Sequence, residues 1–282
     1  MPIKFTKMHG AGNDYIYFNC LNEVFSNIEA LAMRLSDRHK GIGGDGIVLI
    51  CKSDVADAKM RMFNADGSEG KMCGNAIRCV GKYLYDNKIV QKTDISIETL
   101  SGIKYLKLFL DNKNKVASVQ VNMGRAQFTC KDIPVNIDAK EVVNYPLTVD
   151  GKAFRITCLS MGNPHCVVFT DPNAIDIAKI GPLFENNVLF PQRINTEFAI
   201  QLDRNTFAMR VWERGSGETM ACGTGACAVV AAAVANGLVE TNEEVTVKLL
   251  GGDLKIYIDK QTDETIYMTG EAITVFGGEV EL

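Results

Sequence analysis

The sequence predicts a mixed α/β fold, of the α+β type, built from two homologous halves that each wrap a curved, mainly antiparallel sheet around a central helix. Three observations predict it: the chain repeats itself, its strand-like segments are short and bounded by turns, and one helical segment is apolar on every side. The 282 residues are enough for two domains, and 46% hydrophobic with 23% charged residues is typical of a globular protein.

The repeat appears as a nearly constant offset of 149 or 150 positions between matching segments. The matches are residues 60–64 with 209–213, Cys73 with Cys222, and residues 12–13 with 162–163. Because chance does not easily hold one offset over so many residues, we predict one domain over residues 1–120 and a second over residues 121–267. Two halves with the same plan predict a single functional site at the interface between them.

Short strands and four helices account for most of the chain. The first helix is expected to start at Ser26, with Glu29 completing a capping box, and to run to about Arg38; its counterpart starts at Asp176. One further helix in each half follows the matched cysteine. The second of these, residues 226–236, has no polar face, so protein must surround it. The predicted strands are residues 15–19, 47–51, 60–63, 95–99, 103–110, 118–121, 167–170, 207–212, 245–250 and 254–258.

Charge and cysteine content exclude several classes of protein. A net charge of −4 without basic clusters argues against nucleic acid or an anionic membrane as a partner. The longest apolar run, residues 226–235, is about half of the roughly 20 residues that a membrane span needs. Nine cysteines without an export signal indicate a reducing compartment, the cytoplasm. The sequence contains no Cys-x-x-Cys pair, so no metal site is expected.

The two matched cysteines each stand where a glycine-rich turn enters a helix. The first helical amides lack partners within a helix and carry partial positive charge, so they can bind a carboxylate and stabilise a thiolate. Removing an α-proton needs a base and positive charge near the carboxylate, and inverting the centre needs an acid on the opposite face. Cys73 and Cys222 can be this base and acid without metal or pyridoxal phosphate. The amides expected to bind the carboxylate belong to Gly74, Asn75, Gly223 and Thr224.

Other interpretations of these residues are possible from the sequence. Both cysteines could be buried core residues, the common state of a reduced cysteine. Cys73 with His165 could form a cysteine-nucleophile hydrolase or amidotransferase, which would leave Cys222 without a role. A duplicated binding module would need neither thiol. Residues 41–46 match the dinucleotide fingerprint GxGxxG, but they follow a helix and precede a strand, the reverse of the required order.

The combination of motifs over essentially the whole chain resembles the diaminopimelate epimerase family. The segments that carry the resemblance are residues 9–14 (HGAGND), 63–68 (FNADGS), 72–76 (MCGNA), 162–165 (GNPH), 195–198 (NTEF), 213–215 (ERG) and 221–225 (ACGTG). The resemblance implies a cofactor-free isomerase that interconverts LL- and meso-2,6-diaminopimelate in lysine and peptidoglycan-precursor biosynthesis. It also implies a homodimer, and a C-terminal strand within residues 268–282 that returns to the first domain.

The resemblance further implies a role for each matching residue. Cys73 and Cys222 would carry the protons, and His165 and Glu213 would tune the two thiols. The amino and carboxylate groups of the substrate would be held by Asn13, Asn64, Asn163, Asn195, Glu213 and Arg214. Arg214 could bind the distal carboxylate with two parallel hydrogen bonds. A proline racemase would share the two cysteines, but a cyclic monocarboxylate has no distal carboxylate for Arg214.

Overall fold

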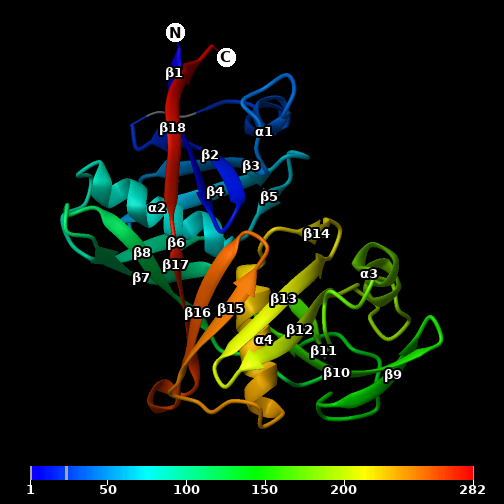
Figure 1. The fold of residues 1–282 in the computed structure, drawn as a ribbon. Helices are drawn as coiled ribbons and strands as arrows, with labels where there is room; N and C mark the ends of the chain where they lie inside the picture. Colours follow the sequence, from blue (N-terminus) through cyan, green and yellow to red (C-terminus); the bar gives the residue numbers. More distant parts are fainter. Residues whose placement is uncertain (1, 23–24, 282) are drawn as a thin grey trace. The chain divides into compact units, whose positions relative to one another are not determined.

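The order of strands and helices is the same in two parts of the chain (Figure 1). The structure is a computed structural model that describes residues 2–22 and 25–281. The chain divides into two compact units, residues 1–122 with 269–282 and residues 123–268. Strands β8 (Val116–Gly124) and β17 (Thr265–Glu271) each contain a point at which the chain passes from one unit to the other.

The first unit contains eight further strands and two helices. Their bounds are β1 (Ile3–Gly10), β2 (Asn13–Cys20), α1 (Ile28–Ser36), β3 (Gly46–Cys51), β4 (Ala58–Asn64), β5 (Glu69–Gly70), α2 (Gly74–Asp86), β6 (Asp94–Thr99), β7 (Gly102–Leu110) and β18 (Ile273–Val280). Strands β2 and β3 are parallel, as are β4 and β6, and the remaining neighbours are antiparallel. Strand β18 pairs with β1, with Ile3 opposite Val280, so the two ends of the described chain lie side by side (Figure 1).

The second unit repeats this arrangement. Its elements are β9 (Tyr145–Val149), β10 (Lys152–Ser160), β11 (Pro164–Phe169), α3 (Ile177–Glu185), β12 (Asn195–Asp203), β13 (Thr206–Glu213), β14 (Gly217–Thr219), α4 (Gly223–Ala235), β15 (Glu244–Leu249), β16 (Gly252–Asp259) and the short 3₁₀ helix η1 (Lys260–Thr262). Strands β11 and β12 are parallel, as are β13 and β15, and the other neighbours are antiparallel. The predicted α+β fold with two homologous, mainly antiparallel halves is confirmed.

One pair of side-chain hydrogen bonds occurs at the same place in both units. Arg61 on β4 makes two hydrogen bonds to Glu69, of 2.7 and 3.1 Å. Arg210 on β13 makes the same pair to Glu218, of 2.6 and 3.0 Å. The two arginines are 149 residues apart in the sequence, and so are the two glutamates. The offset seen in the sequence therefore corresponds to the same local structure in each unit.

Helix α4 is the central helix of the second unit. Its residues are almost all buried, and it contacts β10, β11, β12 and β16 (Figure 1). Asn236 is its C-cap, and Gly237 follows with a φ of 70°, the left-handed conformation that favours glycine at a helix end. The predicted apolar helix and its stop are confirmed. Among the helices of the described residues, none is long and apolar enough to cross a membrane.

The two shorter helices begin in different ways. Helix α3 is capped as predicted, because the Asp176 side chain accepts a hydrogen bond from the Lys179 amide. Helix α1 does not begin with the predicted Ser26–Glu29 capping box. Its N-cap is Asn27, in the left-handed conformation with φ 52° and ψ 51°, and no side-chain hydrogen bond caps the helix. A capping box requires an extended N-cap residue, so this prediction was wrong.

Candidate active site

Two helices begin directly after the matched cysteines. Cys73 is the N-cap of α2, with φ −134° and ψ 122°, and Cys222 is the N-cap of α4, with φ −118° and ψ 109°. Gly74 and Gly223 are the first helical residues, and Asn75 and Thr224 follow them. The first amides of any helix have no carbonyl partner inside the helix, which makes each of these two helix starts a place for an anion.

In the first unit, Asn13 organises the surroundings of Cys73. The Cys73 thiol donates to Asn13 Oδ1 at 3.4 Å, and Asn75 Nδ2 donates to the same oxygen at 3.4 Å. Asn13 Nδ2 donates in turn to Asp45 Oδ2 at 2.7 Å. The Asp45 carboxylate therefore determines which way the Asn13 amide points. Together Asn13, Asp45, Cys73 and Asn75 form what we call the Cys73 cluster.

Asn64 lies at the end of β4 and is part of a tight turn. Its Nδ2 donates to Ser68 Oγ at 2.9 Å, and its main-chain amide donates to the Ser68 carbonyl at 2.9 Å. Gly67 gives this turn its left-handed residue, with a φ of 87°. The side-chain oxygen of Asn64 can accept a further hydrogen bond.

In the second unit, a chain of hydrogen bonds runs from Cys222 into the interior. The Cys222 sulfur lies 3.4 Å from Thr224 Oγ1, and Asn163 Nδ2 donates to that hydroxyl at 3.2 Å. Asn163 Oδ1 lies 3.0 Å from His165 Nε2, and His165 Nδ1 lies 2.6 Å from Glu197 Oε1. We call these five residues, with Glu213, the Cys222 cluster.

The direction of these bonds determines where one proton lies. Because Asn163 donates through Nδ2 to Thr224, its oxygen faces His165, and His165 must therefore carry a proton on Nε2. His165 and Glu197 are both fully buried. The remaining proton of the pair lies between Nδ1 and Glu197 Oε1, as an imidazolium–carboxylate pair or as a neutral imidazole with a carboxylic acid.

The beginning of α4 packs closely against Glu197. A Cβ atom on Gly225 would lie 2.7 Å from Glu197 Oε1 and 3.2 Å from Cys222 Cβ. The Gly225 amide donates to the Cys222 sulfur at 3.4 Å. Glycine at this position therefore brings the first turn of the helix close to both the carboxylate and the thiol.

Glu213 makes direct contact with the Cys222 thiol. Burial raises the pKa of Glu213, while hydrogen bonds from Thr219 and Cys222 lower it. Burial, followed by the charges of Glu213 and Glu197, raises the pKa of Cys222 well above its usual value. These surroundings therefore favour the protonated form of the Cys222 thiol.

Asn195 and Arg214 are joined through the backbone. Asn195 Nδ2 donates to the Pro164 carbonyl at 2.8 Å, and its Oδ1 accepts from the Arg214 amide at 2.9 Å. The Arg214 guanidinium is half-buried and donates to the Gln192 carbonyl at 3.0 Å. Asn195 thus ties the start of β12 to the turn that follows β13, and Arg214 keeps further donors for a ligand.

Two residues of these clusters were not identified from the sequence. Asp45 belongs to the glycine-rich segment that was considered only for nucleotide binding. Glu197 is the third residue of β12 and precedes an apolar run, and a charge in this buried part of the strand was the available signal. Within residues 2–22 and 25–281, no group of three or more His, Cys, Asp or Glu side chains is placed to hold a metal ion.

The family model and the most similar curated relatives all belong to one family. The sequence model of diaminopimelate epimerase matches residues 5–129 and 157–275. The chain is 53% identical to the diaminopimelate epimerase of Acetivibrio thermocellus over 281 residues, which covers 99% of each protein. It is 52% identical to that of Methanococcus maripaludis strain S2 over 281 residues, with 99% of this chain and 100% of the relative covered.

Solved structures share the fold at low sequence identity. A phenazine biosynthesis protein of the PhzF family from Bacillus anthracis has a TM-score of 0.70 at 17% identity, with both chains fully covered. A hydroxyproline epimerase from Agrobacterium vitis, with bound trans-4-hydroxy-L-proline, has a TM-score of 0.70 at 14% identity, covering 100% of this chain and 93% of the other. These likenesses support the two-domain architecture.

Proposed function

This chain belongs to the diaminopimelate epimerase family, and on that premise we propose that it inverts one stereocentre of 2,6-diaminopimelate, interconverting the LL and meso isomers. It is an isomerase that acts on a small molecule. One observation supports the mechanism above all: the two cysteines that the internal repeat aligns are both N-caps of buried helices. The reaction would be a step in the formation of lysine and of peptidoglycan precursors.

The proposed reaction transfers one proton at each face of the α-carbon. One cysteine, as thiolate, would take the α-proton, while the other, as thiol, would deliver its proton to the opposite face. As the proton leaves, negative charge would build on the α-carboxylate. The amides of Gly74, Asn75, Gly223 and Thr224 are suited to stabilise this charge, because they belong to the first turns of α2 and α4.

The surroundings of the two thiols favour the protonated form of both. Cys222 holds its proton, since burial and the neighbouring carboxylates raise its pKa. Cys73 also donates its proton, to Asn13 Oδ1. One of the two thiols must therefore lose a proton before it can act as the base. Glu213 would take part at Cys222, because its carboxylate accepts a hydrogen bond from that thiol.

The remaining predicted residues would hold the ends of the substrate. Arg214 would bind the distal carboxylate, and His165 would act on Cys222 through Asn163 and Thr224. The ammonium groups would be met by side-chain oxygens and the carboxylates by side-chain amides. These polar groups belong to Asn13, Asn64, Asn163, Asn195 and Glu213.

Two further proposals rest on the family and on composition. We propose that the protein is a homodimer, as the family resemblance implies, and that it acts in the cytoplasm, where its nine cysteines would stay reduced. Sedimentation equilibrium of the reduced protein tests the first: a mass of twice 30.9 kDa is expected, and a monomer at micromolar concentration would contradict it.

Hydrogen exchange tests the proposed reaction directly. The reduced protein is incubated with LL-diaminopimelate in deuterium oxide, without added cofactor, and the α-proton signal is followed by NMR. Deuterium should enter one α-carbon as the meso isomer appears. The Cys73→Ser and Cys222→Ser variants should each lose inversion. The Cys227→Ala variant, changed at another buried cysteine of α4, is the matched control and should keep it.

The possible outcomes separate the competing functions. Exchange with proline but not with diaminopimelate would retain the two-cysteine mechanism and overturn the substrate. Exchange with neither would remove the proposed role of the cysteines and favour a hydrolase or a binding protein. Inversion that persists in both serine variants would overturn the mechanism while leaving the substrate in place.

A further inference from the structure

Two cysteines outside the proposed reaction lie directly opposite each other on neighbouring strands. Cys20 ends β2 and Cys51 ends β3, and the two residues are partners in the parallel register. Neighbouring strands are about 4.8 Å apart, and paired residues point to the same face of the sheet. This separation falls within the range of about 4.4–6.8 Å between the Cα atoms of a disulfide. The pairing therefore allows a disulfide bond without moving either strand far.

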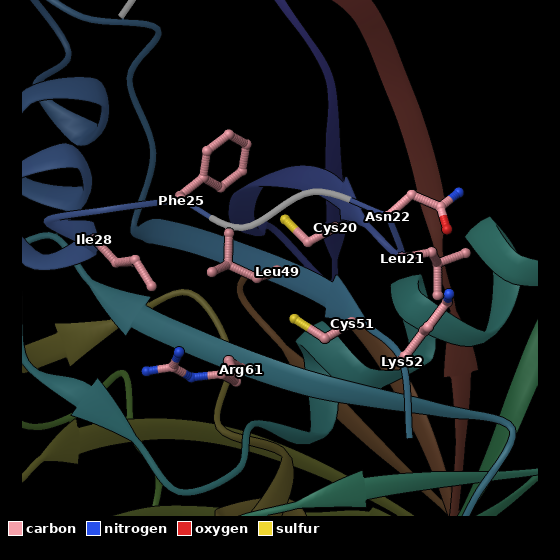
Figure 2. Close-up of a pocket in the computed structure, with 9 residues that line it drawn as sticks. All are labelled: Cys20, Leu21, Asn22, Phe25, Ile28, Leu49, Cys51, Lys52 and Arg61. Atoms are coloured by element: carbon pink, nitrogen blue, oxygen red, sulfur yellow. The ribbon is translucent and has the colours of Figure 1, made fainter. Parts of the chain in front are cut away.

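A cavity of about 460 Å³ opens onto both sulfur atoms. Figure 2 shows Cys20 and Cys51 next to each other within it, on neighbouring strands. Cys51 is half-buried, and Cys20 is 7% exposed. A small molecule in the cavity can thus reach the Cys51 sulfur. The cavity is lined by Cys20, Leu21, Asn22, Phe25, Ile28, Leu49, Cys51, Lys52 and Arg61.

The charges around Cys51 favour its thiolate. A hydrogen bond from the Cys20 thiol lowers the pKa of Cys51 to about 7, with help from the positive charges of Arg61 and Lys59, against the effects of burial and of the Glu69 carboxylate. A thiolate is the form of cysteine that attacks electrophiles. At neutral pH the Cys51 thiolate is therefore favoured more strongly than that of an ordinary cysteine.

A second pair of cysteines has the same backbone arrangement without the cavity or the charges. Cys158 on β10 and Cys166 on β11 are also direct partners, in an antiparallel register, and both are fully buried. Burial raises the pKa of Cys166 well above its usual value, and contact with Cys158 raises it further. This pair is an internal control. Its two thiols are also on paired residues, but solvent molecules cannot reach them, and the raised pKa of Cys166 disfavours its thiolate.

We propose that Cys20 and Cys51 form a modification site for small hydroperoxides, which convert the pair into an intramolecular disulfide. The Cys51 sulfur attacks the peroxide, the O–O bond breaks, and an alcohol or water leaves with the second oxygen. The Cys20 sulfur then attacks the resulting sulfenic acid. The new S–S bond forms as the S–O bond breaks, and the hydroxide leaves as water with the proton of Cys20. Two electrons pass from the two sulfurs to the peroxide.

Peptide mapping of the oxidised protein tests this site. The reduced full chain is treated with hydrogen peroxide at neutral pH, alkylated, digested with trypsin and analysed by mass spectrometry. Cys20 and Cys51 lie in separate tryptic peptides, residues 8–34 and 41–52, whereas Cys158 and Cys166 share residues 156–179. We expect peptides 8–34 and 41–52 to become linked first, while 156–179 stays alkylated at both cysteines. Linkage within 156–179 at the same rate would overturn the proposal.

Two variants separate the roles of the two thiols. In Cys20→Ser the sulfenic acid at Cys51 has no partner, so a dimedone adduct should accumulate on Cys51. In Cys51→Ser, Cys20 should stay reduced under the same treatment. Equal oxidation of Cys20 in that variant, or no adduct on a folded Cys20→Ser protein, would contradict the proposal. The readout is a peptide mass, so it is independent of the proposed epimerase activity.

Discussion

Replacing Glu197 tests the buried part of the Cys222 cluster. Glu197 and His165 are both fully buried, and 2.6 Å separates Glu197 Oε1 from His165 Nδ1. Since His165 already carries a proton on Nε2, its Nδ1 depends on Glu197 for a partner. Alanine at position 197 removes that partner and leaves a cavity. Glutamine keeps the volume, and its amide can donate to Nδ1 of the neutral imidazole.

The expected loss differs strongly between the two variants. Breaking a buried charged pair by removing one partner costs about 3–5 kcal/mol. We therefore expect Glu197→Ala to lower the free energy of unfolding by about 3–5 kcal/mol. Glu197→Gln exchanges one hydrogen bond for another of opposite direction, so it should lower the free energy of unfolding by about 1 kcal/mol.

Urea unfolding followed by tryptophan fluorescence measures both values. Trp212 is the one tryptophan of the chain and lies on β13, in the same unit as Glu197. The Nε2–H signal of His165 in a nitrogen–proton NMR spectrum checks the tautomer in the Gln variant. The reasoning would be refuted if Glu197→Ala cost less than about 1 kcal/mol, the average for a single mutation, or if both variants cost the same.

Three further changes test neighbouring features. Gly225→Ala places a Cβ against Glu197, and chemical denaturation should show a loss of about 1–3 kcal/mol; a gain from helix propensity alone would contradict this. Because the pKa of Glu213 is raised, the folded state keeps a proton that the unfolded state loses above about pH 4.3. The stability of wild type relative to Glu213→Gln should therefore fall as pH rises through this range in urea titrations, and a constant difference would refute it. Gly46→Ala would bring a Cβ onto the Phe63 carbonyl, so its thermal midpoint should drop, whereas an unchanged midpoint would show that the strands separate easily.

Local signals made the two cysteine helices predictable. Each begins at the glycine of a Cys-Gly pair, and the run of alanines and valines after Cys222 leaves no polar face. The start of α1 could not be predicted in the same way, because Asn27 adopts a left-handed conformation that a capping pattern does not reveal. Strand β12 was missed because only residues 198–200 of it form an apolar run, and it begins with three polar residues. One of these, Glu197, is buried because His165 from another strand is its partner.

Contacts within the candidate clusters depend on strand pairing that the sequence does not state. The parallel register that sets His165 opposite Asn195 also places Glu197 on the same face, two residues further along β12. In the same way, the choice of Asp45 as the partner of Asn13 depends on how the glycine-rich segment folds back after α1. Motifs identified the thiols and asparagines, whereas the carboxylates that orient them required the fold.

The pairing of β1 with β18 has a consequence for synthesis of the protein on the ribosome. The second unit is one continuous segment, residues 123–268, so it can fold as soon as this segment has emerged. The first unit needs residues 273–280 to complete its sheet, although the rest of it is translated earlier. Until then the outer edge of β1 has unpaired backbone groups, which are prone to pair with other chains. The half that is synthesised first is thus completed last, which reverses the usual N-to-C order of domain folding.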